Sequence, residues 1–360
     1  MDANPFLGVV LHATGGLAAA SFYLPYKKVK GWAWENYWLL GGFFSWIVAP
    51  SLFAGLIVPE TWDILCQTPA QTLFLTWFFG VLWGIGGLTF GLTMRYLGIA
   101  LGYAIALGLC AAFGTLVPPL FAGDLISITQ TRSGQVLLLG VFACLAGITL
   151  SGKAGMAKEK ELSDEQKKKT VSEFNFSKGM LIAVFCGVMS ASLSYGFTAG
   201  KPISAIAAEN GVAKVWGNLP VLVVMLLGGF TTNFIWCMYL ILKKNTLGDY
   251  GRTTFAGKNI SLPRNYLLCV IAGLTWYLQF FFYGMGETKM GLYKFSSWAL
   301  HMASIIIFST CWGIMLREWM GTSRRARVWV ALGLCVLICS IIVIGLGNHM
   351  AATAAENKGL

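Results

Sequence analysis

Polar side chains that could bind or carry a solute are rare in this sequence, and they lie inside long apolar segments. Two are histidines, His12 and His301, and two are carboxamides, Asn233 and Gln279. Imidazole takes up and releases protons near neutral pH, and a carboxamide both donates and accepts hydrogen bonds. Such groups inside a bilayer are costly and usually functional. Together they suit the binding of a neutral hydroxylated solute along with protons.

Aromatic side chains accompany the amide and one histidine at helical spacing. Trp276, Gln279 and Tyr283 follow one another at three and four residues, and Trp298 precedes His301 by three. Each set therefore falls on one helix face. An aromatic ring can cover the C–H face of a sugar while an amide pairs with its hydroxyls. A buried aromatic stripe with an amide bonded to a neighbouring helix would give the same spacing, so both interpretations stay open.

The candidates for proton coupling are His12, His301, Glu35 and Glu287. A histidine can instead be neutral and hydrogen-bonded between two helices. Glu35 and Glu287 lie at the edges of apolar segments, where a solvated carboxylate is the ordinary interpretation. Uphill movement of a neutral solute nevertheless needs a titratable group, and these four are the best placed.

The elements that must position these groups are apolar helices. Of the 360 residues, 56% are apolar and 11% charged, whereas a soluble domain carries about 25% charged residues. A membrane-spanning helix needs about 20 mostly apolar residues. The sequence predicts an all-α membrane protein whose ten spans are roughly 5–25, 36–58, 71–93, 98–122, 134–152, 179–200, 215–242, 266–286, 293–316 and 327–347.

Positive charge is distributed unevenly among the connections between these spans. The odd-numbered connections hold 20 of the 26 Lys and Arg residues. Because such residues stay on the cytoplasmic side, we expect both termini to face the periplasm. The one long polar stretch, 153–178, is expected to be a cytoplasmic connector.

The eighth expected span repeats part of the third at an offset of 193 residues. Gly273, Trp276, Tyr283, Gly284 and Gly291 align with Gly80, Trp83, Phe90, Gly91 and Gly98. The match makes Trp83 a candidate sugar contact, although chance among glycine-rich helices would also explain it. Two five-span halves, 1–152 and 179–360, would enter the membrane in opposite senses because five is odd. Inverted repeats around a midplane site are typical of secondary transporters.

Other classes of function find little support. The net charge is +11, but the basic residues lie between apolar segments, so bilayer orientation explains them better than a nucleic-acid partner. No HExxH motif, nucleophile elbow or dinucleotide fingerprint is present. Cys335 and Cys339 have no nearby His or carboxylate to complete a metal site. We expect no enzyme activity, no metal and no cofactor.

Five strings resemble bacterial L-rhamnose–proton symporters, a family of the drug/metabolite transporter superfamily. They are residues 22–35 (FYLPYKKVKGWAWE), 83–86 (WGIG), 91–98 (GLTMRYLG), 276–283 (WYLQFFFY) and 297–302 (SWALHM). The resemblance extends over nearly the whole chain. It implies ten helices in two inverted five-helix repeats, and import of a deoxyhexose with protons from the periplasm across the inner membrane.

Two positions depart from the family pattern. Gly87 stands where an Asn is expected, and Lys294 is the nearest polar residue where an acidic one is expected before Ser297. The first departure bears on which sugar is bound. The second leaves both the proton and sodium open as the coupling ion.

The predicted function is import of L-rhamnose or a related deoxysugar by alternating access. The predicted sugar contacts are Trp83, Asn233, Trp276, Gln279, Tyr283, Trp298, His12 and His301. The expected partners are a small sugar and membrane lipid, and the sequence does not determine an oligomeric state. The alternatives are a drug or amino-acid exporter of the same superfamily, and a membrane sugar sensor that transports nothing.

Overall fold

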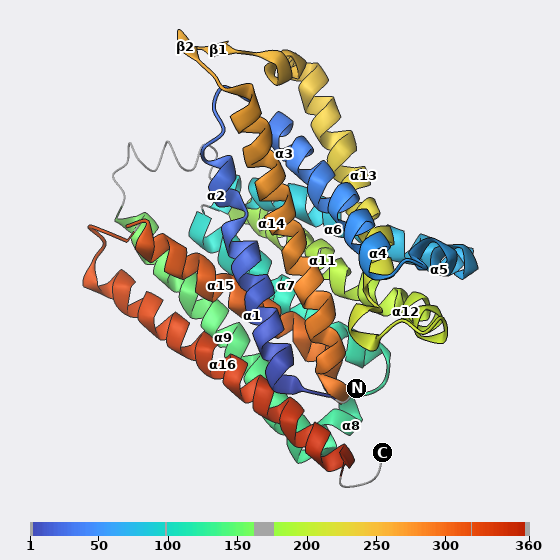
Figure 1. Cartoon of the computed structure of the whole chain (residues 1–360). Coiled ribbons are helices and arrows are strands. Elements are labelled where there is room, and N and C mark those ends of the chain that lie inside the picture. Colours follow the sequence, from blue (N-terminus) through green and yellow to red (C-terminus); the bar gives the residue numbers. More distant parts are fainter. Residues whose placement is uncertain (1–2, 98, 162–175, 318, 357–360) are drawn as a thin grey trace.

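The computed structural model describes residues 3–97, 99–161, 176–317 and 319–356, which are almost entirely helical (Figure 1). The helices are α1 (Pro5–Ser21), α2 (Tyr23–Tyr26), α3 (Trp34–Phe43), the π-helical turn η1 (Phe44–Val48), α4 (Ala49–Ile57), α5 (Thr61–Gln67), α6 (Ala70–Leu97), α7 (Ile99–Phe121), α8 (Leu125–Gln130), α9 (Arg132–Lys160), α11 (Phe176–Ala199), α12 (Lys201–Glu209), α13 (Leu219–Lys244), α14 (Leu262–Lys289), α15 (Ser297–Met315) and α16 (Arg324–Glu356). Short 3₁₀ turns are η2 (Lys214–Trp216), η3 (Leu247–Gly251) and η4 (Gly291–Ser296), and one hairpin pairs β1 (Thr254–Phe255) with β2 (Lys258–Asn259).

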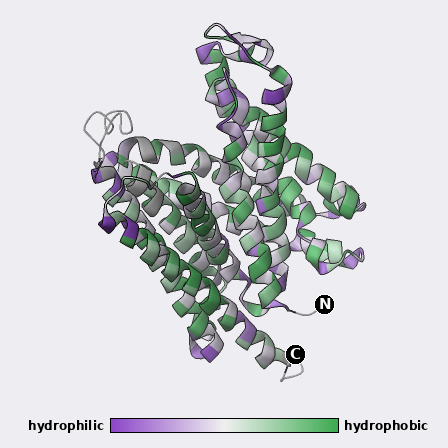
Figure 2. Cartoon of the chain, turned by 60° about the vertical axis from the view of Figure 1, so that its left-hand side comes forward, coloured by the Kyte–Doolittle hydropathy of each residue, from purple (hydrophilic) through white to green (hydrophobic). Residues whose placement is uncertain are grey.

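The helices agree with the prediction of an all-α membrane protein. Within the described residues, nine helical segments are long and apolar enough to cross a membrane, and the apolar stretch Ile105–Phe121 is shorter. The expected count of ten is reached only if that shorter stretch also spans. Figure 2 shows apolar residues along most of each long helix, with hydrophilic residues gathered near the helix ends.

Three helices run beyond the ends expected from hydropathy. Helix α6 reaches Leu97, α9 reaches Lys160 and α16 reaches Glu356. The α9 extension carries Lys and Glu, which are good helix formers although they are polar. The expected connector 153–178 therefore begins as helix, and residues 162–175 lie outside the described part of the chain.

Each half of the chain packs mainly against the other. Helix α1 packs on α14 and α15, α11 packs on α6 and α7, and α9 packs along α16. Helices α1 and α14 are antiparallel, because the backbone N–H of Asn4 donates to the Lys289 carbonyl at 3.0 Å. Helices α1 and α15 are parallel, because the Trp312 indole donates to Ser21 Oγ at 2.9 Å. Helices α1 and α14, which are more than 240 residues apart in the sequence, are thus neighbours in the structure.

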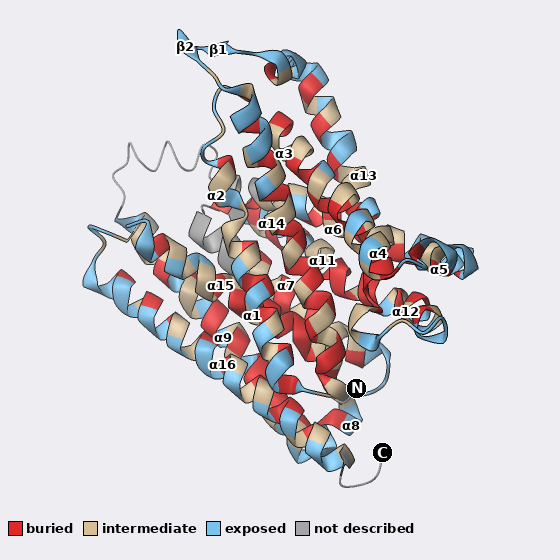
Figure 3. Ribbon diagram, in the orientation of Figure 1, coloured by how far each residue is buried: buried red, intermediate tan, exposed pale blue. Residues whose placement is uncertain are grey.

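The buried surface lies where these helices meet, and the outer faces expose large apolar side chains (Figure 3). Phe6, Leu56 and Phe121 are 81%, 73% and 86% exposed, which suits contact with lipid rather than water. The N- and C-terminal ends lie at one end of the bundle, and the β1–β2 hairpin lies at the other (Figure 1).

Glycines permit the closest approaches between helices of the two halves. A Cβ at Gly80 in α6 would meet the Met225 carbonyl of α13, and a Cβ at Gly273 in α14 would meet the Gly41 carbonyl of α3. Backbones in direct contact leave no room for a side chain. The glycines predicted as packing residues therefore set how tightly the halves join.

We expect Gly80→Val to separate α6 from α13 and to destabilise the folded protein by about 1–3 kcal/mol, the usual cost of overpacking. Thermal unfolding of the detergent-solubilised protein measures this loss. Gly55→Ala is the matched control, because no atom lies within 4 Å of a Cβ at Gly55 in α4. Equal melting temperatures for the two variants would contradict the close contact.

Candidate functional site

Four predicted site residues meet at the centre of the bundle, on α1, α14 and α15. The His12 ring lies 5.2 Å from the Tyr283 ring and 6.4 Å from the His301 ring, centroid to centroid. Tyr283 in turn lies 5.2 Å from His301 and 5.7 Å from Trp298. The structure therefore brings together two imidazoles, a phenol and an indole. The two histidines, residues 12 and 301, are 289 positions apart in the sequence.

Most polar atoms of this cluster have no protein partner. His12 is completely buried, and neither of its ring nitrogens makes a hydrogen bond; the same is true of Nδ1 of His301. The side chains of Gln279 and Tyr283 are 7% and 3% exposed, and neither makes a hydrogen bond to a residue that the structure describes. A buried polar group without a partner costs about 1–3 kcal/mol. These groups are therefore available to water, protons or a ligand.

Trp298 of α15 is held in place by helix α7. Its indole N–H donates to the Cys110 carbonyl of α7 at 2.9 Å, and a Cβ at Gly114 would meet the indole ring. With its N–H occupied, Trp298 can offer a ligand only its ring. It forms a rigid aromatic wall beside Tyr283.

A cavity of about 160 Å³ lies beside Tyr283. Several of its lining residues belong to the last turns of α7 and α14, and these helices end at the end of the bundle that carries both termini (Figure 1). A cavity of about 150 Å³ accommodates a six-membered ring such as benzene. Tyr283 and Glu287 of α14 line it, together with Gly114, Pro118, Pro119, Ala122, Asp124, Ser194, Phe197, Thr198, Lys201, Leu292, Lys294 and Phe295. The lining combines aromatic rings, hydroxyls and charges of both signs, which fits a hydroxylated solute better than a purely apolar one.

Glu287 lies in this cavity and is oriented by the start of α13. The Asn218 amide donates to its carboxylate at 2.8 Å and also to the Gly284 carbonyl at 3.0 Å. Lys294, the residue at which the sequence departs from the family pattern, lines the same cavity. Ser194 and Thr198 also line the cavity, but their hydroxyls donate to backbone carbonyls: Ser194 to Gly114 at 2.9 Å and to Ala191 at 3.0 Å, and Thr198 to Ser194 at 3.2 Å.

Trp83 and Trp276 belong to a separate aromatic cluster and do not contact the histidines. Trp276 stacks on Phe22 at 4.4 Å, and its ring lies 4.7 Å from Trp46. Trp83 reaches the same Trp46 at 6.0 Å. Trp46 lies in the π-helical turn η1 and is 1% exposed. Sequence reasoning missed Trp46, because a lone tryptophan in an apolar run carries no spacing signal.

Asn233 has its amide committed within the protein. Its Oδ1 accepts from the Trp38 indole at 3.0 Å, and its Nδ2 donates to the Gly229 carbonyl at 2.9 Å. Trp38 lies 4.9 Å from Trp276. The geometry favours a positioning role for Asn233, through Trp38, over direct contact with a sugar.

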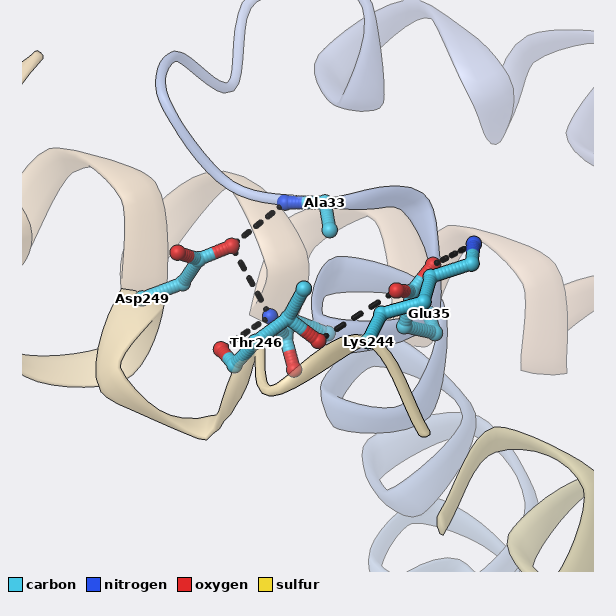
Figure 4. Close-up of polar contacts among 6 residues, drawn as sticks. Ala33, Glu35, Lys244, Thr246 and Asp249 are labelled. Atoms are coloured by element: carbon cyan, nitrogen blue, oxygen red, sulfur yellow. Dashed lines mark hydrogen bonds and ion pairs between the residues drawn. The ribbon is translucent and has the colours of Figure 1, made fainter. Parts of the chain in front are cut away.

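Glu35 is buried, so the ordinary interpretation of it as a solvated interfacial carboxylate is wrong. It is 1% exposed, and its carboxylate accepts from Lys244 at 3.2 Å and from Thr246 at 3.3 Å. Asp249 beside it accepts from the Ala33 backbone N–H at 2.7 Å and from Asn36 at 3.0 Å (Figure 4). These bonds join the start of α3 to the end of α13, at the end of the bundle away from the termini.

Comparison with known proteins gives one consistent result. Residues 1–352 match the family described as L-rhamnose-proton symport protein. The L-rhamnose-proton symporter of Salmonella gallinarum is 37% identical and that of Cronobacter sakazakii 38% identical, each over 342 residues. Both alignments cover 95% of this chain and 97% of the relative. The family description names a transport activity rather than a catalysed reaction. The resemblance seen in the five sequence strings is thereby confirmed: this chain belongs to the L-rhamnose-proton symport protein family.

Proposed function

We propose that this protein imports L-rhamnose or a closely related deoxysugar with protons across the bacterial inner membrane. Family membership over almost the whole chain supports the substrate class and the proton; sodium, which the sequence left open, has no such support. The observation that carries the proposal is a set of buried polar groups with no hydrogen-bond partner among the described residues: the His12 ring, the Gln279 amide, the Tyr283 hydroxyl and Nδ1 of His301. A sugar and a proton would supply the missing partners.

In this proposal the sugar enters the cavity between α7, α11 and α14. Tyr283 forms its inner end, and its hydroxyl is free to pair with a sugar hydroxyl. Phe197 and Trp298 flank Tyr283 at 5.0 and 5.7 Å between ring centroids, so apolar ring surface is available to the C–H face of the sugar. Gln279, one turn further into α14, hydrogen-bonds the sugar when it has moved past Tyr283. Trp83 and Trp276 line the later part of the path.

The proton is carried by the pair His12 and His301, which a solute in the cavity reaches through Tyr283. Glu287 lies one turn from Tyr283 on α14 and lines the cavity, where it can exchange protons with the outside. Glu35 lies at the other end and is held by Lys244, so it would act only when that ion pair opens. Solute binding changes how readily the two imidazoles hold a proton. This coupling links the movement of the sugar to the movement of the proton.

Alternating access would come from two inverted repeats of five helices, 1–152 and 179–360, within the wider drug/metabolite transporter superfamily. Close contacts recur in the pattern that such a duplication requires. The contact of Gly80 with Met225 corresponds to that of Gly273 with Gly41. The contact of Gly8 with Met290 corresponds to that of Gly179 with Leu97, and the contact of Gly16 with Ser304 corresponds to that of Gly187 with Leu109. Met290 and Leu97 are related by the same 193-residue offset as Gly273 and Gly80. Helices that repeat their contacts in this way can rock about a shared centre.

The orientation follows from the basic residues of the odd-numbered connections. Under the positive-inside rule both termini face the periplasm, and so does the cavity beside Tyr283. The Glu35 and Asp249 contacts then lie at the cytoplasmic end, where they hold α3 against α13. Sugar would reach the cavity from outside, as import requires.

We expect Gln279→Ala to abolish uptake of labelled L-rhamnose at low sugar concentration. Loss of one buried hydrogen-bonding group removes about 1–3 kcal/mol of sugar binding, roughly 5–150-fold in affinity. The melting temperature should be unchanged or higher, because the amide has no protein partner to lose. Right-side-out vesicles with an imposed pH gradient provide the assay.

Gln67→Ala is the matched control, since its amide is exposed and pairs with Asn210 at 3.3 Å, away from the cavity. It should transport as the wild type does. Normal uptake by Gln279→Ala would remove this residue from the site and leave family membership untouched.

We expect His12→Gln and His301→Gln each to lose accumulation driven by a pH gradient while keeping exchange of labelled for unlabelled sugar. Glutamine replaces the hydrogen bonds of imidazole but does not titrate near neutral pH. Liposomes that contain the purified protein allow both modes to be measured.

The third histidine, His349, is exposed near the end of α16, and His349→Gln serves as the control for the same chemical change. Accumulation at the wild-type level in both buried-histidine variants would show that the coupling group lies elsewhere.

A further inference from the structure

The turn between α15 and α16 forms a pocket whose described lining residues include two arginines and no carboxylate. It has a volume of about 420 Å³ and is lined by Arg317, Arg327, Ile314, Trp319, Met320, Gly321 and Thr322. In Figure 1 this turn lies at the upper left, next to the end of α9. The pocket is far from the central cavity and plays no part in the transport path proposed above.

The two arginines of the pocket have no partner within the described residues. Neither guanidinium makes an ion pair or a hydrogen bond there, although each presents five donors. Glu161, at the end of α9, is engaged elsewhere, because its carboxylate accepts from the Ser323 backbone N–H at 2.7 Å. Hydrogen bonds from the Ser323 side chain and backbone lower the pKa of Glu161, which favours its charged form at the start of α16.

Further positive charge is held beside the pocket by aromatic rings. The Lys158 ammonium lies 4.9 Å from the ring centre of Trp319, and that of Lys153 lies 5.3 Å from Trp329. Both lysines belong to α9 and both rings to the turn or to α16. These cation–π contacts fix the basic end of α9 against the pocket.

The backbone at Arg317 is left-handed just after the end of α15. Its φ is +61°, in the left-handed region where helices end on Gly or Asn because a larger side chain is unfavourable. Backbone outliers of this kind cluster at ligand-binding sites. An arginine at such a position is understandable if its guanidinium is needed in the pocket.

The position of the pocket relative to the spans identifies the kind of anion. One candidate span, Gly291–Met315, ends just before the pocket, and another, Arg324–Ala355, begins in it. Ile314, Met315, Leu316 and Met320 are 47–69% exposed beside the arginines. Tryptophan and arginine at the end of a span are typical of the membrane interface. A ligand here meets donors for a phosphate and an apolar surface for acyl chains together.

We infer that the α15–α16 pocket binds the phosphate headgroup of an anionic phospholipid of the cytoplasmic leaflet. Arg317 and Arg327 donate to the phosphate oxygens, and the exposed apolar side chains of the same turn lie along the acyl chains. Basic pockets between spanning helices on the cytoplasmic side suit this class of lipid. The inference is independent of which solute the central cavity transports.

The test is a titration of the purified full-length protein in neutral detergent with short-chain phosphatidylglycerol, followed by native mass spectrometry. Arg317→Gln/Arg327→Gln should weaken binding roughly 30-fold, which corresponds to about 1 kcal/mol for each arginine. Arg324→Gln/Arg325→Gln is the matched control, because it removes the same charge from exposed arginines of α16 that do not line the pocket. The control should change the affinity by less than about threefold.

Three results would overturn the inference. They are equal losses in the two double variants, equal binding of phosphatidylcholine by the wild type, and full competition by inorganic phosphate at the same concentration. The first would indicate diffuse attraction, the second an acyl-chain effect, and the third a site for free phosphate.

Arg317→Gly keeps the inference testable even if the double variant folds poorly. Glycine is favoured at a left-handed helix end, so this variant should melt at a higher temperature than the wild type in phosphatidylcholine micelles. It should bind phosphatidylglycerol more weakly. A variant that gains stability and keeps full lipid affinity would contradict a role for Arg317 in the pocket.

Discussion

The central constraint on this protein is that polar groups buried at the middle of a bilayer bundle must find partners. Helices α1, α14 and α15 place two imidazoles and a phenol at their junction, with the buried amide of Gln279 one turn along α14. Most of their polar atoms have no hydrogen-bond partner among the described residues. In a structural core such groups would be paired or replaced by apolar residues. Keeping them unpaired is costly, and the cost is understandable if a solute and protons occupy the junction in turn.

The remaining structure holds this junction in place. Glycine contacts join the halves through backbone atoms, so the interface has little side-chain material to rearrange. Aromatic rings around Trp46 fill the space between Trp83 and Trp276. At the end of the bundle away from the termini, buried carboxylates tie α3 to α13 and η3 through charge-assisted hydrogen bonds (Figure 4). Firm contacts at one end and a cavity at the other are what a transporter needs if its site opens to one side at a time.

Much of the fold, and the contact among four of the candidate site residues, could be predicted from the sequence. Apolar length located the spans, and helical periodicity placed Tyr283 with Gln279 and Trp298 with His301, so their convergence needed only that α14 and α15 be neighbours. The rest depended on contacts between distant segments. The burial of Glu35 comes from Lys244 and Thr246, more than 200 residues away, and the amide of Asn233 is occupied by an indole 195 residues away. Trp46 and the arginines of the α15–α16 turn acquire their roles only from backbone geometry, which hydropathy does not encode.

A structure of the protein with L-rhamnose bound tests most directly whether the unpaired groups form the transport site. The sugar should lie in contact with the Tyr283 ring, with one of its hydroxyls within hydrogen-bonding distance, about 2.7–3.2 Å, of the Tyr283 hydroxyl or the Gln279 amide. A sugar found elsewhere, with His12, Gln279, Tyr283 and His301 still unpaired, would contradict the assignment.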